Sequence, residues 1–381
     1  MKNHKQLDLD GEKSNVILFS QTIDHLRFPL SILVVLIHVY PQNNPLFIPI
    51  KNIDIYNINI SAIYSIIARS GHYFSQIAVP FFFFTSGYYF FREKTFTALI
   101  YKEKIKQKSK TLIIPYILWN LIAIFFLLPF TYKFIDIQYV LSCFWNITSW
   151  SNNSIIELPI NHIVSAPIAF PLWFLRDLII LIFLSPVIYI GIKKIGIIFI
   201  VFLAILFILN ICSLPGIGTT GIFFFSAGAY LKLTDKNPIA ECHKLKSTSI
   251  VISLIMFFLT VFKVGHWISY ITVNIYCIFG VISIINITSK IIKERNIPQS
   301  NLSKVSFFLY AIHTIIFFKF SILTFSKTLS EKIFMCDMYH IGLIFSYFLS
   351  PLLCTTICVV VFNTMKKISP TFLSMLTGKR I

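Results

Sequence analysis

The chain has 381 residues, of which 56% are hydrophobic and only 13% charged, and its mean hydropathy is +0.78. A soluble domain could not bury that much apolar surface, so the composition excludes an ordinary soluble protein and indicates one that crosses a membrane repeatedly. The formal net charge of +18 would suggest a nucleic-acid partner in a soluble chain. Here the positions of the charges along the chain give another explanation.

Ten apolar stretches are each long enough to cross about 30 Å of hydrocarbon as a helix. An even number of crossings places both termini on the same side of the membrane. We therefore expect an all-α protein, with a ten-helix transmembrane domain at 23–363 between a short cytoplasmic tail at 1–22 and a basic cytoplasmic tail at 364–381. The stretches are 23–41, 73–91, 111–130, 171–191, 195–213, 217–233, 247–264, 267–289, 304–325 and 341–363.

Lysine and arginine are far more numerous in the connections on the side of the termini than in those on the opposite side. This asymmetry follows the positive-inside rule, which places the basic side in the cytoplasm. The basic balance then needs no nucleic-acid partner. We expect a multi-pass protein of the plasma or inner membrane, with the lipid bilayer as its surroundings.

The first stretch, IDHLRFPLSILVVLIHVYP, includes Asp24, Arg27 and His38, ionisable residues in a segment otherwise suited to lipid. Arg27 and His38 are eleven residues apart, which in a helix is about 20° past three full turns and a rise of roughly 16 Å. Asp24 lies three residues before Arg27 and can pair with it. Because ionisable residues inside a membrane are costly, this pattern predicts a polar slot from the membrane edge to mid-depth.

Two later stretches carry further candidates. Arg176 and its neighbour Asp177 follow the start of the stretch PLWFLRDL, and they could pair with neighbours, snorkel or line an active cavity. In the stretch SFFLYAIHTIIFF, His313 is expected roughly 13 Å from the cytoplasmic edge, close to the depth of His38. Tyr310 precedes His313 by three residues and shares its helix face.

Other segments allow two interpretations each. Ser86 and Gly87 follow a run of four phenylalanines, where small residues favour close helix packing or leave room for a ligand beside His38. The basic inner connection 92–110 fits an amphipathic surface helix or a rim that attracts a polyanion. The outer connection 131–171 is long enough to be a platform for an acceptor, although Glu157 and His162 in it are weak signals.

Several catalytic and metal-binding motifs are absent from the sequence, which restricts the reactions that the protein could catalyse. There is no H-x-x-x-H pair or paired acid for a metal site, no G-x-S-x-G nucleophile elbow and no glycine-rich phosphate loop. A mid-membrane histidine above a cation fits general-base acyl or group transfer, and it equally fits a proton-coupled transporter of a lipid-linked sugar or small solute. A receptor or assembly partner without catalysis is a third reading.

Five segments resemble the acyltransferase 3 family of integral membrane acyltransferases, and they occur in family order over most of the chain. They are the R-x10-H spacing from Arg27 to His38, VPFFFFTSGYYFF at 79–91, IIPYILW at 113–119, PLWFLRDL at 171–178 and SFFLYAIH at 306–313.

The resemblance implies transfer of an acyl group, most often acetyl, from cytoplasmic acyl-CoA to a hydroxyl of an extracytoplasmic glycan such as a surface polysaccharide. It implies acetyl-CoA as a donor substrate, with no bound cofactor. The donor phosphates would lie near Arg27, and His38 would act as a base or receive the acyl group in passing. The expected catalytic residues are His38, Arg27, Asp24 and His313, and the expected substrate-binding residues are Tyr310, Trp173, Arg176 and Ser86.

Overall fold

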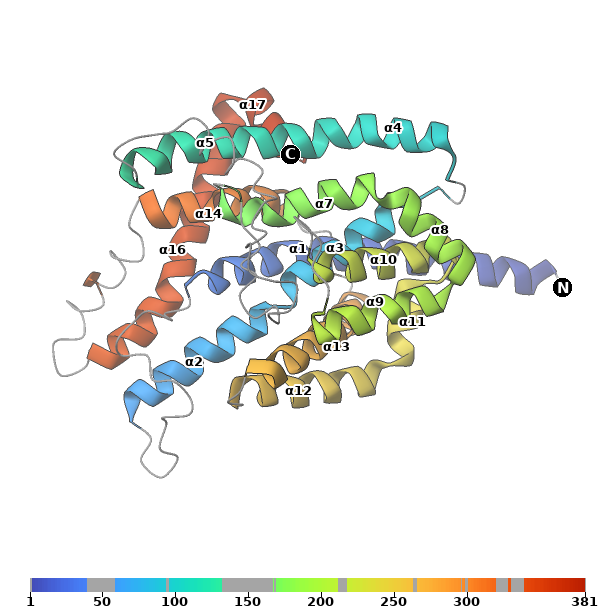
Figure 1. Cartoon of the computed structure of the whole chain (residues 1–381), viewed down its shortest axis with the longest axis horizontal. Coiled ribbons are helices and arrows are strands. Elements are labelled where there is room, and N and C mark those ends of the chain that lie inside the picture. Colours follow the sequence, from blue (N-terminus) through green and yellow to red (C-terminus); the bar gives the residue numbers. More distant parts are fainter. Residues whose placement is uncertain are drawn as a thin grey trace.

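The computed structural model describes a helical molecule, and the described part of the chain contains no strand (Figure 1). This agrees with the expected all-α class. The described residues are 2–39, 59–93, 96–131, 167, 169–211, 218–262, 266–295, 297–298, 301–319, 328–329 and 339–380.

Most helices are joined by short connections and run along one another (Figure 1). The α-helices are α1 Lys2–Ile37, α2 Ile60–Ser75, α3 Ala78–Phe90, α4 Ala98–Lys108, α5 Ile114–Thr131, α7 Trp173–Phe183, α8 Ser185–Ile195, α9 Ile197–Leu209, α10 Thr219–Leu233, α11 Pro238–Lys244, α12 Lys246–Phe262, α13 His266–Arg295, α14 Ser306–Lys319, α16 Tyr339–Ile368 and α17 Pro370–Leu376. Short non-α turns are the π-helix η2 Ser109–Ile113 and the 3₁₀-helices η3 Phe170–Leu172 and η4 Asn301–Lys304.

Three helical segments in the described part are long and apolar enough to cross a membrane, namely Ala98–Phe126, Ile268–Arg295 and Ile341–Ile368. Two bent pairs raise the number to five if each pair is one span: Phe170–Phe183 with Ser185–Ile195, bent by 61°, and Pro238–Lys244 with Lys246–Phe262, bent by 70°. The membrane character is therefore supported, whereas the count of ten and the cytoplasmic termini stay predictions.

The break between α7 and α8 has a local cause. Pro186 has no backbone N–H, so the carbonyl of Ile182, four residues earlier, lacks its usual helical donor. The hydroxyl of Ser185 donates to that carbonyl instead, at 2.7 Å. The stretch expected as one span at 171–191 is consequently two helices.

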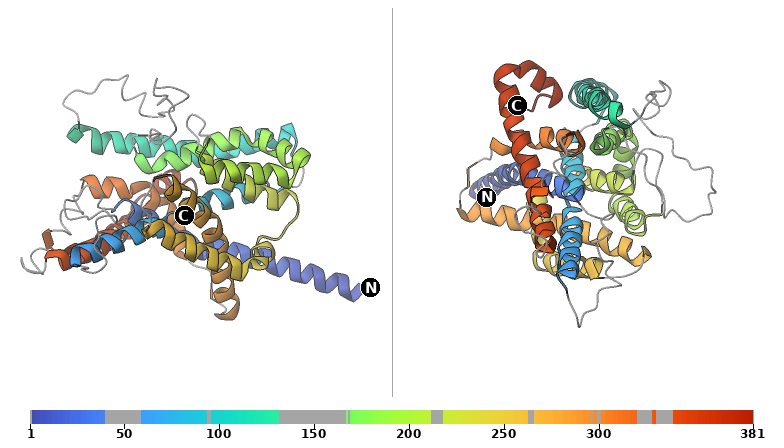
Figure 2. Two further views of the ribbon diagram at one scale, coloured as in Figure 1. Left: turned by 60° about the horizontal axis from the view of Figure 1, so that its bottom comes forward. Right: turned by 90° about the vertical axis from the view of Figure 1, so that its left-hand side faces the viewer.

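Helix α1 differs from its prediction at both ends. Residues 2–22, expected as an irregular tail, are helical, and the first turns project beyond the other helices (Figures 1 and 2). At the other end the helix stops at Ile37, ahead of Pro41, whose ring cannot continue an α-helix without losing a hydrogen bond. His38 thus lies in the turn that follows, where its N–H donates to the carbonyl of Val35 at 3.1 Å.

Two more connections are helical. Residues 42–72 lie between the first two expected spans and carry no helix prediction, but α2 begins at Ile60 within them. The Asn59 side chain caps this helix by accepting from the N–H of Ala62 at 2.8 Å. The inner connection contains the helix α4, which continues through η2 into α5, and neither interpretation of its basic residues is decided by this. Its Lys104 is buried and paired with Glu93, so this helix packs on the protein along one face.

The glycines of α3 and α10 let these helices touch backbone to backbone. A Cβ on Gly87 would lie 1.9 Å from the carbonyl oxygen of Phe225, and one on Gly228 would lie 2.0 Å from that of Phe84. Real Cβ atoms do not come that close to carbonyl oxygens, so only glycine fits at either position. Of the two interpretations of the small residues near Ser86, the structure confirms close packing for Gly87.

Replacing Gly228 by alanine should therefore force α3 and α10 apart. Overpacking of this kind typically costs about 1–3 kcal/mol, so we expect a lower thermal unfolding midpoint of the purified protein in detergent. Gly218→Ala is the matched control, because the nearest atom to its Cβ would be Asp177 Oδ2 at an ordinary 3.9 Å. Equal midpoints for the two variants would contradict the backbone contact.

Candidate functional site

Two histidines from distant parts of the sequence lie next to each other. His38 follows α1 and His313 is on α14, and these helices pack together. Their ring centroids are 5.0 Å apart and the ring planes are inclined by 35°. The sequence placed both side chains at similar depth, and the structure brings them to one place.

The His313 ring has a defined orientation. Its Nδ1 lies 2.8 Å from the carbonyl oxygen of Tyr310 and 3.2 Å from that of Leu309. Both neighbours can only accept a hydrogen bond, so Nδ1 carries the proton and the lone pair belongs to Nε2. The side chain is completely buried, which fixes this arrangement. His313 is thus set up with a basic nitrogen at Nε2.

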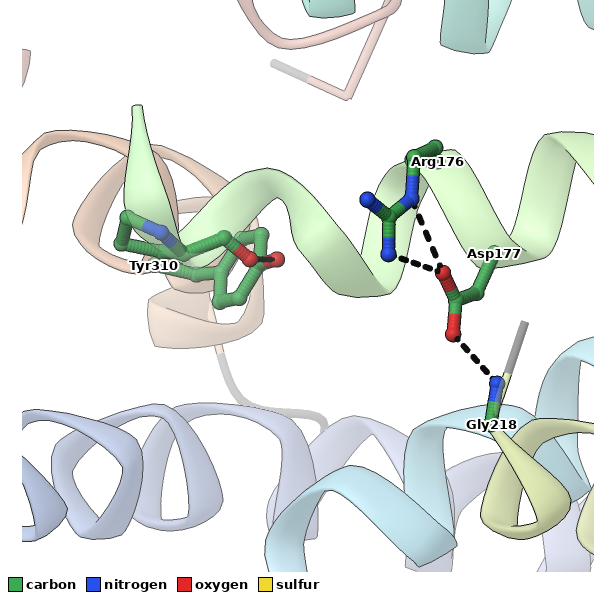
Figure 3. Close-up of polar contacts among 5 residues, drawn as sticks. Arg176, Asp177, Gly218 and Tyr310 are labelled. Atoms are coloured by element: carbon green, nitrogen blue, oxygen red, sulfur yellow. Dashed lines mark hydrogen bonds and ion pairs between the residues drawn. The ribbon is translucent and has the colours of Figure 1, made fainter. Parts of the chain in front are cut away.

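Phe170 covers one side of His38. The two rings meet edge to face, with centroids 5.4 Å apart and planes at 88°. Phe170 opens η3, and the hydroxyl of Tyr310 donates to the carbonyl of the next residue, Pro171 (Figure 3). Tyr310 therefore holds in place the segment that contacts His38. The hydroxyl of Tyr310 already donates to this backbone carbonyl, and the expected contact of Tyr310 with substrate stays a prediction.

The predicted ion pair on α1 is present. Nη1 of Arg27 donates to Oδ1 of Asp24 at 2.9 Å, with the i to i+3 spacing expected from the sequence. The Arg27 side chain remains 42% exposed, so part of the guanidinium is accessible to a ligand. Eleven residues of rise separate it from His38, roughly 16 Å along the helix. The guanidinium of Arg27 and the imidazole of His38 therefore lie at the two ends of one face of α1 and the turn after it, here called the stripe on α1.

Arg176 and Asp177 form a buried pair (Figure 3). Nε and Nη2 of Arg176 donate to Oδ1 of Asp177 at 3.2 and 3.1 Å, and Oδ2 accepts the N–H of Gly218 at 3.1 Å. Both side chains are fully buried. Of the alternatives predicted for Arg176, this geometry favours pairing within the fold, where the carboxylate ties α7 to the start of α10.

The other two predicted substrate contacts, Trp173 and Ser86, lie on α7 and α3. Trp173, half-buried at the start of α7, packs on Phe83 with ring centroids 6.4 Å apart. Ser86 is half-buried on α3. Their roles stay predictions, and so does the acceptor platform, since residues 132–166, with Glu157 and His162, lie outside the described residues.

A third histidine near the site was missed. His72 on α2 lies beside the backbone of Ile37 and close enough to His38 for their charges to interact. Sequence reasoning placed it at the end of a loop. The signal available was the helical spacing of Ile60, Ile63 and Ile67 behind Asn59, a good N-cap residue.

These contacts define what the site can do. A histidine whose Nε2 carries the lone pair can take a proton, and a second imidazole 5.0 Å away can share or relay it. Within the described residues, no group of three or more His, Cys, Asp and Glu side chains is placed to hold a metal ion. The accessible guanidinium of Arg27 can bind an anion.

Comparison with known proteins identifies the family. No curated protein and no solved structure gives a significant match to the chain. A family model described as an acyltransferase domain, that of acyltransferase 3, matches residues 21–364. Because this match spans nearly the whole chain and includes both histidines, the protein belongs to the acyltransferase 3 family and is an acyltransferase that transfers groups other than aminoacyl groups.

Proposed function

We propose that the protein is a membrane O-acyltransferase that moves an acetyl group from acetyl-CoA in the cytoplasm to a hydroxyl of an extracytoplasmic glycan. Family membership supports acyl transfer. The observation that carries the proposal is the contact between His38 and His313, far along α1 from the accessible Arg27. A donor bound at Arg27 and an acceptor arriving from the opposite side would meet at the histidines.

The proposed reaction needs one proton acceptor and one proton donor. The acceptor hydroxyl oxygen attacks the thioester carbonyl carbon while His38 takes the hydroxyl proton. The carbon–sulfur bond then breaks, the ester remains on the glycan, and the proton passes to the thiolate to give free CoA. His313, with its lone pair on Nε2, can accept the proton from His38 or orient it. Transfer through an acyl-histidine at His38 would use the same residues in two steps.

The donor is expected to lie along the stripe on α1. Its phosphates carry negative charge that the Arg27 guanidinium can bind through charge-assisted hydrogen bonds. The extended pantetheine arm is comparable in length to the roughly 16 Å rise between Arg27 and His38, so the thioester can reach the imidazole. Arg27 would thus set the affinity for the donor rather than the chemical step.

The direct test of this function is mass spectrometry of surface glycans from cells with and without the gene. We expect the acetyl mass increment on a glycan sugar to disappear with the gene and to return when the wild-type gene is restored. Restoring a His38→Ala gene should leave the glycan unmodified. Identical glycan masses in all strains would contradict a glycan acceptor.

Replacing Arg27 by alanine should mainly weaken donor binding. Loss of one charge-assisted contact to phosphate is expected to raise the KM for acetyl-CoA by about 10-fold, with a much smaller change in kcat. Steady-state kinetics of the purified protein measure both constants. Arg295→Ala removes an exposed arginine at the end of α13 and serves as the control. An unchanged KM in Arg27→Ala would remove this residue from the donor site.

The proton-coupled transporter is the alternative, and one observation favours it. Three histidines, His38, His72 and His313, lie close together, and a relay of this kind moves protons in transporters. This alternative predicts solute uptake into proteoliposomes that depends on a pH gradient, with no acetyl group transferred. The acyltransferase predicts transfer without uptake.

A further inference from the structure

The last residues of the chain form a fixed structure beyond the part that the family model matches. After α16, residues 369–380 fold back as α17 and a terminal turn, here called the C-terminal hook (Figures 1 and 2). The sequence predicted only a basic tail there. Leu373, Leu376 and Thr377 are buried, and the indole N–H of Trp119 on α5 donates to the carbonyl of Leu376 at 3.0 Å.

The turn after α17 requires a glycine. Gly378 has a φ of +60°, and a Cβ there would lie 2.2 Å from the carbonyl oxygen of Thr111 in η2. The N–H of Lys379 closes the turn by donating to the carbonyl of Ser374 at 2.8 Å. The hook is therefore locked against the α4–η2–α5 helix, and the position of Arg380 at its end is defined.

Arg380 is anchored on one side and accessible on the other. Its guanidinium carbon lies 4.6 Å from the centre of the Phe307 ring on α14, and Nη1 donates to the carbonyl of Thr377 at 3.2 Å. The residue is nevertheless exposed to solvent.

Other cations surround this guanidinium. Arg27 on α1 and Lys108 on α4 are each close enough to Arg380 for their charges to interact with it. The surrounding protein, together with the nearby charge of Arg27, lowers the pKa of Arg380 to about 10, so it stays cationic at neutral pH. Asp24 offsets part of the charge by pairing with Arg27. We call Arg27, Lys108 and Arg380 the basic cluster.

The start of α14 adds to this environment. Phe307, the residue under Arg380, is the second residue of α14, so the positive end of that helix lies beside the cluster. The first residue, Ser306, is buried, and its hydroxyl has no hydrogen-bond partner among the described residues. Positive charges held together at a helix N-terminus repel one another when no anion is bound. A bound anion makes the same arrangement favourable.

We propose that Arg380 of the C-terminal hook and Arg27 of α1 together bind the phosphate groups of the donor nucleotide of acyl-CoA. The inference rests on the proposed function, because it assigns a ligand to the donor end of the same site. The hook then contributes a donor-binding residue from outside the segment shared with the family model.

The test compares binding of CoA and of phosphate-free pantetheine to protein in phosphatidylcholine nanodiscs. In Arg380→Gln, we expect the Kd for CoA to rise by about 10-fold or more, since a charge-assisted contact is lost, and binding of pantetheine to stay unchanged. Lys194→Gln removes an exposed positive charge on α8 and should leave both unchanged. Equal unfolding midpoints establish that the variants are folded.

A second measurement needs no variant. Phenylglyoxal modifies accessible arginines, so mass spectrometry of the wild-type protein should show Arg380 modified, with CoA but not pantetheine slowing that modification. Modification of Arg380 at the same rate with and without CoA would overturn the inference even if Arg380→Gln did not fold.

The remaining outcomes separate the inference from the proposed function. Wild-type binding of CoA with an unchanged Kd in Arg380→Gln would overturn the role of the hook and leave the proposed function standing. No binding of CoA by the wild-type protein would overturn both. If Arg380→Gln instead removed stabilisation by added phosphatidylglycerol and left CoA binding intact, the cluster would hold a lipid phosphate, and the inference would be wrong.

Discussion

Replacing His38 by alanine is expected to lower kcat for acetyl transfer by about 100-fold or more, the usual contribution of a positioned general base. The imidazole is in contact with both His313 and Phe170, so it occupies a defined place. Alanine removes the proposed proton acceptor and leaves the turn at 38–39 intact, because that turn depends on backbone hydrogen bonds. The KM for acetyl-CoA should change little.

His243→Ala is the matched control for this measurement. His243 is exposed on the short helix α11, and its loss should leave transfer unchanged. A combination of His38→Ala with normal unfolding, normal CoA binding and lost turnover would identify a chemical role. Turnover within a few-fold of wild type would remove His38 from the mechanism, whatever the family assignment implies.

Features set by local geometry could be predicted from the sequence. The pairing of Asp24 with Arg27 needs only the i to i+3 spacing of a helix, and it is present. The common depth of His38 and His313 followed from the fixed rise per residue of two helices measured from the same membrane edge. The contact between their rings did not follow from depth alone, because depth does not determine which helix faces meet, and the structure shows it.

Features set by tertiary partners could not be predicted. Helix α2 lacks a long apolar run because it carries Arg69, whose Nε and Nη2 donate to the carbonyls of Val261 and Thr260 at 2.6 and 3.3 Å. Those carbonyls end α12, where they lack partners within their own helix, so a polar residue on α2 is satisfied by a distant helix end. A prediction from the sequence does not include this contact, so it assigns the segment to a loop. The position of His72 near His38 is then missed as well.

The role of Arg176 also depends on a tertiary partner, and the sequence could not decide it. Sequence reasoning left a place in the active cavity and a pairing role equally open, since either puts an arginine near a membrane edge. In the structure its carboxylate partner, Asp177, also accepts the N–H of Gly218, forty-one positions later in the chain. The C-terminal hook is similar, because its buried leucines become informative only once α5 is placed beside them.

His313 should matter for turnover almost as much as His38, and its two neighbouring carbonyls allow a sharp test. In His313→Asn, the side-chain NH₂ can replace Nδ1–H as donor to the carbonyls of Tyr310 and Leu309, but the lone pair of Nε2 is lost. We expect kcat to fall by about 10–100-fold, the loss typical when a supporting partner of a reactive group is removed. KM for acetyl-CoA should stay within a few-fold, because the proposed binding place of the donor phosphates is far along α1.

The comparison variant is His313→Phe, which preserves an aromatic ring in a fully buried place but removes both nitrogens. If His313 acts through Nε2, the asparagine and phenylalanine variants should lose turnover to a similar extent, with the asparagine variant retaining the wild-type unfolding midpoint. If asparagine instead preserved turnover and only phenylalanine lost it, the hydrogen bonds at Nδ1 would be the functional feature. His313 would then be a positioning residue for the segment between α1 and η3, and the proton would pass through His38 without its help.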